Sequence, residues 1–464
     1  MDPIATSTAQ GIAARQRAFF SKGETQTTSF RTQQLRVLRD MIVRRERDIL
    51  DALRRDLGKP ETEAYVSELA VVLHEIDWAL TRVRSWARPR RVRTPVILFP
   101  ATSWIYPQPY GSVLIIGPFN YPFQLAVLPL VGALAAGNCA VVKPSEVAPH
   151  TARLISEMIG ASFDPAYLAV VEGGVEETQV LLADRFDYIL FTGSSKVGRI
   201  VMAAAATHLT PVTLELGGKN PCIVDADADL DKAARRIAWG KFINAGQTCI
   251  APDFVLAHRS IKPALVQRLS ATIDAFFGAD PMASADFGRI INDKHFARLA
   301  SLMHEGDVVI GGRAVAEQRY IAPTVIDNVS WNHPVMQEEI FGPILPVLDF
   351  DTLEETIEVL EGQPKPLAVY YFSSNRARQD EVLRRLRSGG ACINDTFAQM
   401  LNPRLPFGGV GDSGLGAYHG KTSFDTFSHF KSVVKRSTWA DPGFKYPPYK
   451  TPLSSLRRIT RLIY

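Results

Sequence analysis

Short apolar runs alternate with helix-length segments from about residue 112 onward. The runs predict strands, and the segments between them predict helices. The predicted strands are 113–116, 140–142, 168–171 and 188–191, and the predicted helices are 122–136, 149–159, 176–183 and 197–206. Strands that alternate with helices form a parallel sheet with both faces covered. We therefore predict an α/β fold.

A second alternating series follows Gly218 and indicates a second domain. Strands are predicted at 222–224, 308–310 and 368–371, and a helix at 231–242 leads into the loop that contains Cys249. A chain of 464 residues is longer than one hydrophobic core normally supports. Two or three domains are therefore expected.

The composition is that of a globular protein that binds neither nucleic acid nor metal. Apolar residues make up 46% of the chain, charged residues 22%, and the net charge is only +4. No nucleic-acid-binding motif is present. The cysteines form no CxxC pair, and no histidine lies at zinc spacing from them; they are Cys139, Cys222, Cys249 and Cys392. Free thiols favour a reducing compartment, so we predict a cytoplasmic location.

Cys249 is the candidate nucleophile, in the sequence Gly-Gln-Thr-Cys at residues 246–249. A thiolate is the strongest side-chain nucleophile near neutral pH, although most single cysteines are small buried packing residues. Two other segments favour the catalytic interpretation. Glu215 lies in an apolar strand that ends in two glycines, and Asn120 lies between two prolines. Cys139, Cys222 and Cys392 lie in no comparable loop and are interpreted as packing residues.

With these segments, the chain resembles the NAD(P)-dependent aldehyde dehydrogenase superfamily, and most of all its class 3 branch of fatty and aromatic aldehyde enzymes. The resemblance extends to about residue 437 and rests on seven blocks in family order. The blocks are GPFNYP at 117–122, KPSE at 143–146, FTGS at 191–194, LELGGK at 214–219, GQTC at 246–249, EEIFGP at 338–343 and PFGG at 406–409.

The resemblance implies a fold and a domain division. A Rossmann-type NAD(P)-binding domain takes residues 1–84 and 107–213, with 404–420 returning to it, and an α/β catalytic domain takes 214–403. A small β oligomerisation element at 85–106 and 421–440 would extend the sheet of a partner in a homodimer, and strand addition of this kind is physically ordinary. Residues 441–464 form a basic tail.

The implied cofactor is NAD, with NADP also possible. Thr192, Gly193, Ser194 and Gly198 open a helix after strand 188–191, and the free N–H groups at a helix N-terminus suit a pyrophosphate. By resemblance, Lys143 and Glu146 hydrogen-bond the adenosine ribose, and Glu339 and Phe341 position the nicotinamide ribose and ring. A carboxylate near the ribose 2′-hydroxyl favours NAD over NADP. The further implied contacts are Pro118, Phe119, Leu216 and Gly217.

The implied reaction begins with attack of Cys249 on an aldehyde. The thiohemiacetal loses a hydride and becomes a thioester, which water hydrolyses with Glu215 as general base. Burial in an apolar strand raises the pKa of such a carboxylate. The Asn120 amide and the backbone N–H of Cys249 stabilise the oxyanion, and losing one such donor costs ~3–4 kcal/mol. Two alternative interpretations remain: Asn120 is only a turn residue, or Glu215 is a structural salt-bridge partner.

Three other functions fit parts of the pattern. A CoA-acylating relative would pass the thioester to CoA, but such enzymes commonly lack the base found here as Glu215. A glutamyl-phosphate reductase-like enzyme shares the cysteine, but the block at 214–219 argues against it. A catalytically silent structural descendant would not need Asn120, Glu215 and Cys249 together. The resemblance implies medium- to long-chain, aromatic, terpenoid or apocarotenoid aldehydes as substrates.

The tail goes beyond the family pattern. Residues 443–464 contain five basic residues and no acidic one. As a helix from Leu453, the segment places Leu453, Leu456, Ile459 and Ile463 on one stripe. A short basic amphipathic helix suits an anionic membrane surface and is too short to span a bilayer. Peripheral membrane contact through 453–464 and packing of the tail on its own or a partner subunit are both open.

Overall fold

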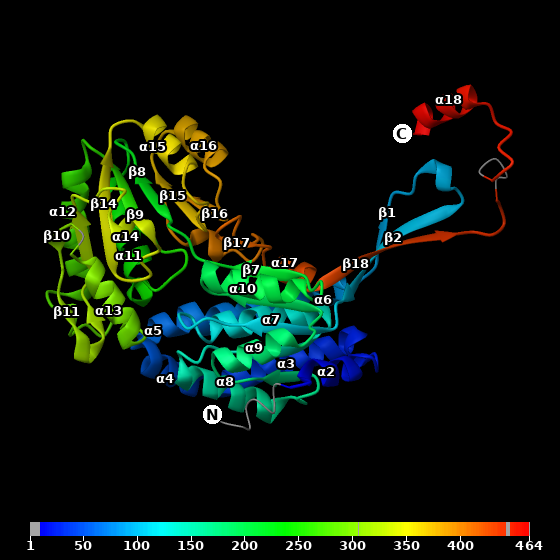
Figure 1. Cartoon of the computed structure of the whole chain (residues 1–464), viewed down its shortest axis with the longest axis horizontal. Helices are drawn as coiled ribbons and strands as arrows, with labels where there is room; N and C mark the ends of the chain where they lie inside the picture. Colours follow the sequence, from blue (N-terminus) through cyan, green and yellow to red (C-terminus); the bar gives the residue numbers. More distant parts are fainter. Residues whose placement is uncertain (1–9, 305, 442–445, 464) are drawn as a thin grey trace.

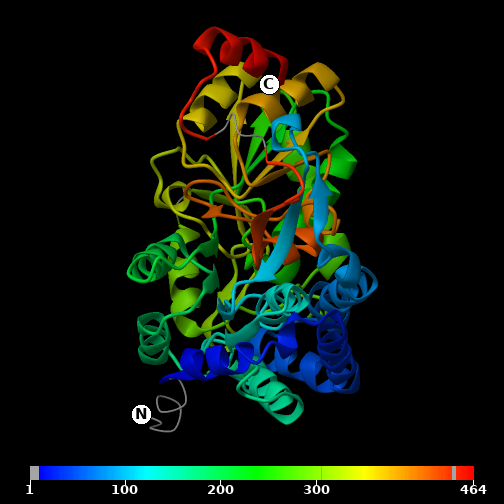
Figure 2. The same ribbon diagram turned by 90° about the vertical axis from the view of Figure 1, so that its right-hand side faces the viewer.

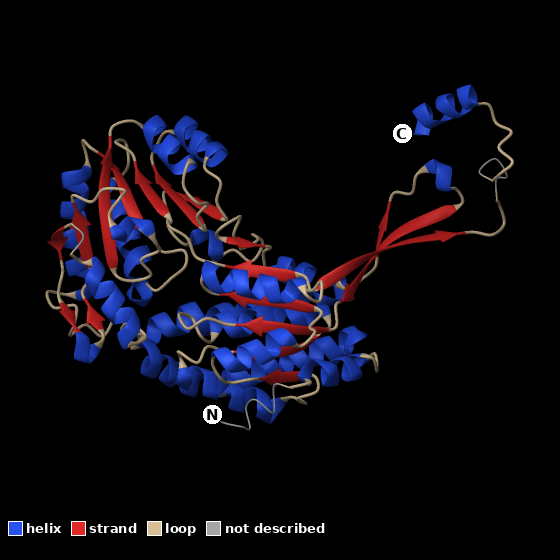
Figure 3. Cartoon of the chain, in the orientation of Figure 1, coloured by secondary structure: helices blue, strands red, loops and turns tan. Residues whose placement is uncertain are grey.

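The computed structural model describes residues 10–304, 306–441 and 446–463. Figure 1 shows two lobes with a narrow arm that extends from one of them, and Figure 3 shows that each lobe surrounds a sheet with helices. The predicted α/β fold is confirmed. Residues 1–9, at the start of the first predicted domain, lie outside the described residues.

The first lobe is built on a six-stranded sheet in the order β17-β7-β6-β3-β4-β5. The strands from β7 to β5 pair in parallel, and β17 pairs antiparallel with β7. They are β3 (Ser112–Ile116), β4 (Cys139–Lys143), β5 (Leu168–Val170), β6 (Tyr188–Thr192), β7 (Val212–Glu215) and β17 (Gly414–Leu415). The apolar runs therefore form the predicted strands, and β3 and β4 are buried along their whole length.

Helices cover both faces of this sheet. The four predicted helices are α7 (Gln124–Ala136), α8 (Pro149–Ser162), α9 (Val175–Ala183) and α10 (Ser195–Ala206). Helix α7 is buried at every position, which explains why it carries no charge. The remaining helices are α2 (Ile12–Phe20), α3 (Thr28–Arg44), α4 (Glu46–Leu57), α5 (Glu61–Ala64), α6 (Val71–Trp86) and α17 (Gly420–Thr426).

The second lobe contains a seven-stranded sheet in the order β10-β13-β14-β9-β8-β15-β16. The strands are β8 (Pro221–Val224), β9 (Phe254–His258), β10 (Asp307–Ile310), β13 (Thr324–Asp327), β14 (Ile344–Phe350), β15 (Ala368–Phe372) and β16 (Gly390–Ile393). The helices are α11 (Leu230–Phe242), α12 (Lys262–Phe277), α13 (Asp293–Leu302), α14 (Pro334–Gln337), α15 (Leu353–Glu361) and α16 (Arg376–Arg385), with a small hairpin of β11 (Ala314–Val315) and β12 (Tyr320–Ile321).

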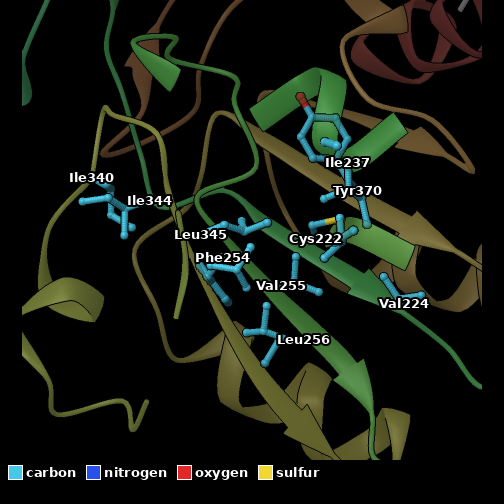
Figure 4. Packing of buried hydrophobic residues seen from close by; sticks show 14 of the residues in the cluster. Cys222, Val224, Ile237, Phe254, Val255, Leu256, Ile340, Ile344, Leu345 and Tyr370 are labelled. Carbon is cyan, nitrogen blue, oxygen red and sulfur yellow. The ribbon is translucent and has the colours of Figure 1, made fainter. Parts of the chain in front are cut away.

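The core of the second lobe supports the loop that contains Cys249. Figure 4 shows Cys222 of β8 packed beside Val255 and Tyr370 of the neighbouring strands. The hydroxyl of Tyr370 donates to the carbonyl of Ile250, at 2.5 Å, so the buried tyrosine is satisfied and fixes the residue after Cys249. Cys139, Cys222 and Cys392 are buried, as expected for packing residues.

The arm is a three-stranded antiparallel sheet in the order β1-β2-β18. Strand β18 (Ser428–Arg436) pairs with β2 (Ala101–Pro109) along its full length, and β1 (Arg90–Val92) lies on the other side of β2. Helix α18 (Leu453–Ile463) forms where the amphipathic pattern predicts it. Figures 1 and 2 show it beyond the arm, and Figure 1 shows it apart from both lobes. Residues 442–445 and 464 of the predicted tail lie outside the described residues.

No helix in the described ranges is long and apolar enough to cross a membrane.

Candidate active site

A cleft with a volume of about 1580 Å³ contains residues of both lobes. Its first wall is formed by the carboxyl ends of β3, β4, β6 and β7, where ligands bind in parallel sheets. Its second wall is formed by the cysteine loop and the segment after α14. Every predicted site residue except Gly198 lines it: Pro118, Phe119, Asn120, Lys143, Glu146, Thr192, Gly193, Ser194, Glu215, Leu216, Gly217, Cys249, Glu339 and Phe341.

The cysteine loop has a strained backbone. Asn244, Ala245 and Gly246 have successive φ values of 53°, 50° and 74°, a region that costs most residues free energy. A Cβ atom at Gly246 would lie 2.2 Å from the carbonyl oxygen of Gly342. Only glycine fits there, and this contact places the cysteine loop against the segment that contains Glu339 and Phe341.

Gln247 holds the strained loop in place. Its side-chain amide donates to the carbonyls of Asn244 and Arg289, both at 3.0 Å, and its oxygen accepts from the N–H of Ile291, also at 3.0 Å. All three partners are backbone groups, so the glutamine replaces the hydrogen bonds that a regular element would have supplied. Cys249 is thus presented from a rigid loop.

Asn120 lies directly against that loop. Its side-chain Nδ2 donates to the carbonyl of Gln247 at 3.0 Å, and its backbone carbonyl accepts from the amide of Asn244 at 2.8 Å. A primary amide has two N–H groups, so one can hold the loop while the other serves the cleft. Asn120 is buried and hydrogen-bonded, which is more than a turn residue requires.

Lys59 and Glu68 support Asn120 and were not identified from the sequence. They form an ion pair with both side chains fully buried. Lys59 also donates to the carbonyl of Asn120 at 3.3 Å, and Glu68 accepts from the N–H groups of Phe123 and Gln124, both at 3.0 Å, at the start of α7. Many exposed charged residues surround both positions in the sequence, so nothing in the sequence marks Lys59 and Glu68 as a buried pair.

Glu215 is the last residue of β7, in register with Thr192 and with Gly414. Both of its carboxylate oxygens are buried and have no hydrogen-bond partner among the described residues. Burial raises the pKa of Glu215 well above its usual value. The interpretation of Glu215 as a salt-bridge partner is therefore wrong, since no cation pairs with it in the described part of the chain.

The surroundings of Cys249 disfavour its thiolate in the free protein. Burial raises the pKa of Cys249, and the negative charges of Glu339 and Glu215 raise it further. The backbone N–H groups of Cys249 and Ile250 act in the opposite direction, because they donate to the sulfur. The sulfur thus lies beside two N–H donors and two carboxyl groups.

Removing the charge of Glu339 should make Cys249 more reactive in the free protein. Burial raises the pKa of Glu339 to about 8, so the group is largely anionic above pH 8. In Glu339→Gln we therefore expect a lower pKa for Cys249 and alkylation by iodoacetamide a few times faster at pH 9, with little change at pH 6.5. Intact-mass spectrometry measures the rate. An unchanged rate at pH 9 would contradict the electrostatic coupling.

The cofactor side of the cleft fits a dinucleotide. Thr192 Oγ1 and Glu339 Oε1 are buried without a partner among the described residues, and Lys143 Nζ lies 2.6 Å from Glu146 Oε2. A Cβ atom at Gly217 would lie 2.0 Å from Glu339 Oε2. Because residue 217 is a glycine, the backbone after β7 can lie directly against the Glu339 side chain on the other wall of the cleft. The rings of Phe119 and Phe341 meet edge to face, with centroids 5.7 Å apart.

The start of α10 is arranged for an anion. The side chain of Ser194 caps the helix by accepting from the N–H of Val197 at 3.4 Å, and Ser194, Ser195 and Lys196 line the cleft. A Cβ atom at Gly198 would lie 2.7 Å from a methyl group of Leu216. Gly198 therefore acts through close helix packing and does not line the cleft.

A parallel sheet of the dinucleotide-binding type lines one cleft together with the strained cysteine loop, and this arrangement places the chain in the class of α/β enzymes that bind NAD(P). The family model for the aldehyde dehydrogenase family matches residues 5–433. The chain belongs to the aldehyde dehydrogenase family, in its class 3-like branch, and is an NAD(P)-dependent aldehyde dehydrogenase.

The relatives include three curated proteins. The 4,4′-diaponeurosporen-aldehyde dehydrogenase of Staphylococcus aureus is 50% identical over 436 residues, which cover 94% of this chain and 95% of the relative. Mouse aldehyde dehydrogenase family 3 member B2 is 47% identical, covering 93% and 91%. The dimeric NADP-preferring aldehyde dehydrogenase of the rat is 48% identical, covering 94% and 96%.

Solved structures have the same fold. The substrate-bound state of Staphylococcus aureus AldH superposes with a TM-score of 0.95 at 48% identity, covering 96% of this chain and 98% of that one. An indole-3-acetaldehyde dehydrogenase in complex with NAD⁺ superposes with a TM-score of 0.85 at 28% identity, covering 93% and 89%.

Proposed function

We propose that this chain oxidises hydrophobic aldehydes to carboxylic acids through a thioester on Cys249 that water hydrolyses. The observation that carries the proposal is the presence in one cleft of a thiol, a buried amide and an unpaired buried carboxyl group: Cys249, Asn120 and Glu215. Acyl transfer needs a nucleophile, an oxyanion donor and a base.

Cys249 loses its thiol proton to solvent, and the thiolate attacks the carbonyl carbon of the aldehyde and gives a thiohemiacetal. The developing oxyanion accepts from the free N–H of the Asn120 amide and from the backbone N–H of Cys249, and each such donor contributes ~3–4 kcal/mol. Thr192, Glu339 and Phe341 would hold NAD(P)⁺ in the cleft, and the cofactor would supply the acceptor for the hydride that leaves this carbon. A thioester then remains on Cys249, and Glu215 takes a proton from the water that attacks it.

Hydrophobic substrates are proposed because of the relatives. One relative is named for 4,4′-diaponeurosporen-aldehyde, a name that indicates an apocarotenoid. The experiment is a panel of fatty, aromatic and apocarotenoid aldehydes, with acetaldehyde as the small control, measured by NADH absorbance. Long aldehydes should give the higher kcat/KM, since each buried CH₂ contributes about 0.8 kcal/mol. Equal turnover of acetaldehyde would contradict this class, and turnover only with added CoA would favour the acylating alternative.

We propose the domain division 1–84 and 107–213 with 404–420, then 214–403. The two sheets support this division, except that strand β7 (Val212–Glu215) of the first sheet crosses the boundary at 213/214. Strand β17 returns to the first sheet beside β7, and every strand from β8 to β16 in the larger sheet falls within 214–403. Residues 85–106 and 421–440 contain β1, β18 and most of β2 of the arm, although β2 continues to Pro109 and helix α17 within 421–440 packs on the first lobe.

We propose a homodimer in which the arm contacts a second copy of this chain. The outer strands β1 and β18 each have one edge with no neighbouring strand in the described ranges. Large apolar side chains are exposed along the arm and just after it: Val96, Phe99, Phe430, Val434 and Trp439. Exposed apolar groups and open strand edges are typical of a protein interface.

We also propose that helix α18 contacts anionic membranes. In the described part of the helix, Leu453 is 63% exposed, and the side chains of Arg458 and Arg461 are exposed. Each basic residue near an anionic surface contributes ~1 kcal/mol. Full-length protein should therefore sediment with liposomes rich in anionic lipid at low salt, and a chain lacking 454–464 should bind at least tenfold more weakly.

Two comparisons test this membrane prediction. Neutral liposomes should not retain the full-length protein, and the truncated chain should keep its NADH-coupled turnover of a soluble aldehyde. If the full-length protein stays in the supernatant with anionic liposomes at low salt, the tail instead packs on protein.

A further inference from the structure

We infer that Lys365, Arg384 and Arg387 form a phosphate-binding rim on the second lobe, opposite the start of α10. All three line the interlobe cleft. Their side chains are exposed and form no hydrogen bond or ion pair with another residue of the ranges 10–304, 306–441 and 446–463. We call these three residues the cationic rim. The inference extends the cofactor site of the proposed function to a wall that the sequence motifs do not include.

The three rim side chains have no acidic partner, whereas the neighbouring Arg385 has two. Arg385 also lines the cleft, but its guanidinium pairs with Glu354 and Glu361, at 2.6 and 2.9 Å. Arg384 and Arg387 lie on either side of Arg385 and Leu386, at the end of α16, and no carboxylate neutralises them. Three like charges on one wall without an acidic partner favour an anionic ligand.

A chain of contacts between neighbouring residues connects the rim to the start of α10. Ser195 Oγ donates to the carbonyl of Asp412 at 3.1 Å, so the first turn of α10 touches the segment before β17. A Cβ atom at the adjacent Gly411 would lie 3.7 Å from Lys365 Nζ. The residue after Lys365, Pro366, accepts from the N–H of Gly389 at 3.1 Å, which places the turn containing Arg387 beside Lys365.

The strand order decides which phosphate the rim can reach. The rim adjoins the segment before β17, whereas Lys143 and Glu146 follow β4, four positions away in the order β17-β7-β6-β3-β4. Neighbouring strands lie about 4.8 Å apart, so the two places are separated by roughly 19 Å. The rim therefore contacts the pyrophosphate or the nicotinamide half of the dinucleotide, and not a 2′-phosphate on the adenosine ribose.

The test measures binding without an aldehyde. The triple variant Lys365→Gln, Arg384→Gln, Arg387→Gln is titrated with NADH and NADPH by fluorescence, and with ADP-ribose and AMP by calorimetry. Both reduced dinucleotides and ADP-ribose should bind about tenfold more weakly, and AMP should be unaffected. The difference between wild type and variant should shrink with salt, since exposed charges are screened.

A matched control is Arg376→Gln, at the opposite end of α16, which should bind every probe as the wild type does. The double variant Arg384→Gln, Arg387→Gln shows how much of the loss in affinity comes from these two arginines and how much from Lys365. If the triple variant binds NADH as tightly as the wild type does, the cationic rim does not bind the dinucleotide. If only the binding of NADPH is weakened, the rim contacts the 2′-phosphate and its position was inferred wrongly. Wild-type protein that binds NADH but oxidises no aldehyde would instead refute the proposed function and leave the rim standing.

Discussion

Cys249→Ala should abolish aldehyde oxidation while the protein still binds NADH. Without the thiol no thiohemiacetal forms, and no other described thiol can replace it because Cys139, Cys222 and Cys392 are buried outside the cleft. Loss of a nucleophile that works with its base as a unit commonly costs 10⁴-fold or more. Turnover measured by NADH absorbance should fall below a few per cent of wild type, with an unchanged dissociation constant for NADH.

The control for this variant is Cys139→Ala, at the start of β4 and thus at the far end of the strand from Lys143. It should retain turnover, with at most a modest loss of stability from a small cavity. Residual activity of Cys249→Ala above a few per cent would show that another residue is the nucleophile. The NADH titration separates loss of chemistry from loss of folding.

The strands at the centre of the first sheet could be predicted from the sequence, because parallel strands buried on both faces are continuous apolar runs. In the second sheet only β8, β10 and β15 were predicted, whereas β9, β13, β14 and β16 were not. The run at 113–116 became β3, and the run at 188–191 became β6. The arm shows the limit of this reasoning. Strand β2 contains Pro107 and Pro109 and pairs with β18, which lies more than 300 residues later in the chain. No local pattern identifies such a partner.

The residues of the candidate site also fall into two groups, those that the sequence identifies and those that only the structure reveals. Residues with a chemical role in a motif, such as Asn120 and Cys249, could be located before the structure was known. The residues that hold them could not. The ion pair of Lys59 and Glu68 has its meaning only because folding buries both side chains, and the unpaired state of Arg384 is visible only once Arg385 is seen to take the nearby carboxylates.

Glu215→Gln should convert steady turnover into a single burst of NADH. The thiol and the oxyanion donors are intact in this variant, so hydride loss still proceeds and the thioester accumulates on Cys249. A positioned general base contributes about 10²- to 10⁴-fold, and deacylation should slow by that factor. Intact-mass spectrometry after mixing with aldehyde and NAD should find one acyl group per chain, and Cys249→Ala should carry none.

The rate of deacylation should also depend on pH if Glu215 is the base. Burial raises the pKa of Glu215, so the ionised base becomes scarcer as the pH falls, and wild-type deacylation should slow toward acid pH. The amide of Glu215→Gln does not titrate, and its residual deacylation should lose this dependence. Glu338→Gln, an exposed carboxylate of the same cleft, should keep steady turnover. Undiminished steady hydrolysis in Glu215→Gln would remove Glu215 from the role of base.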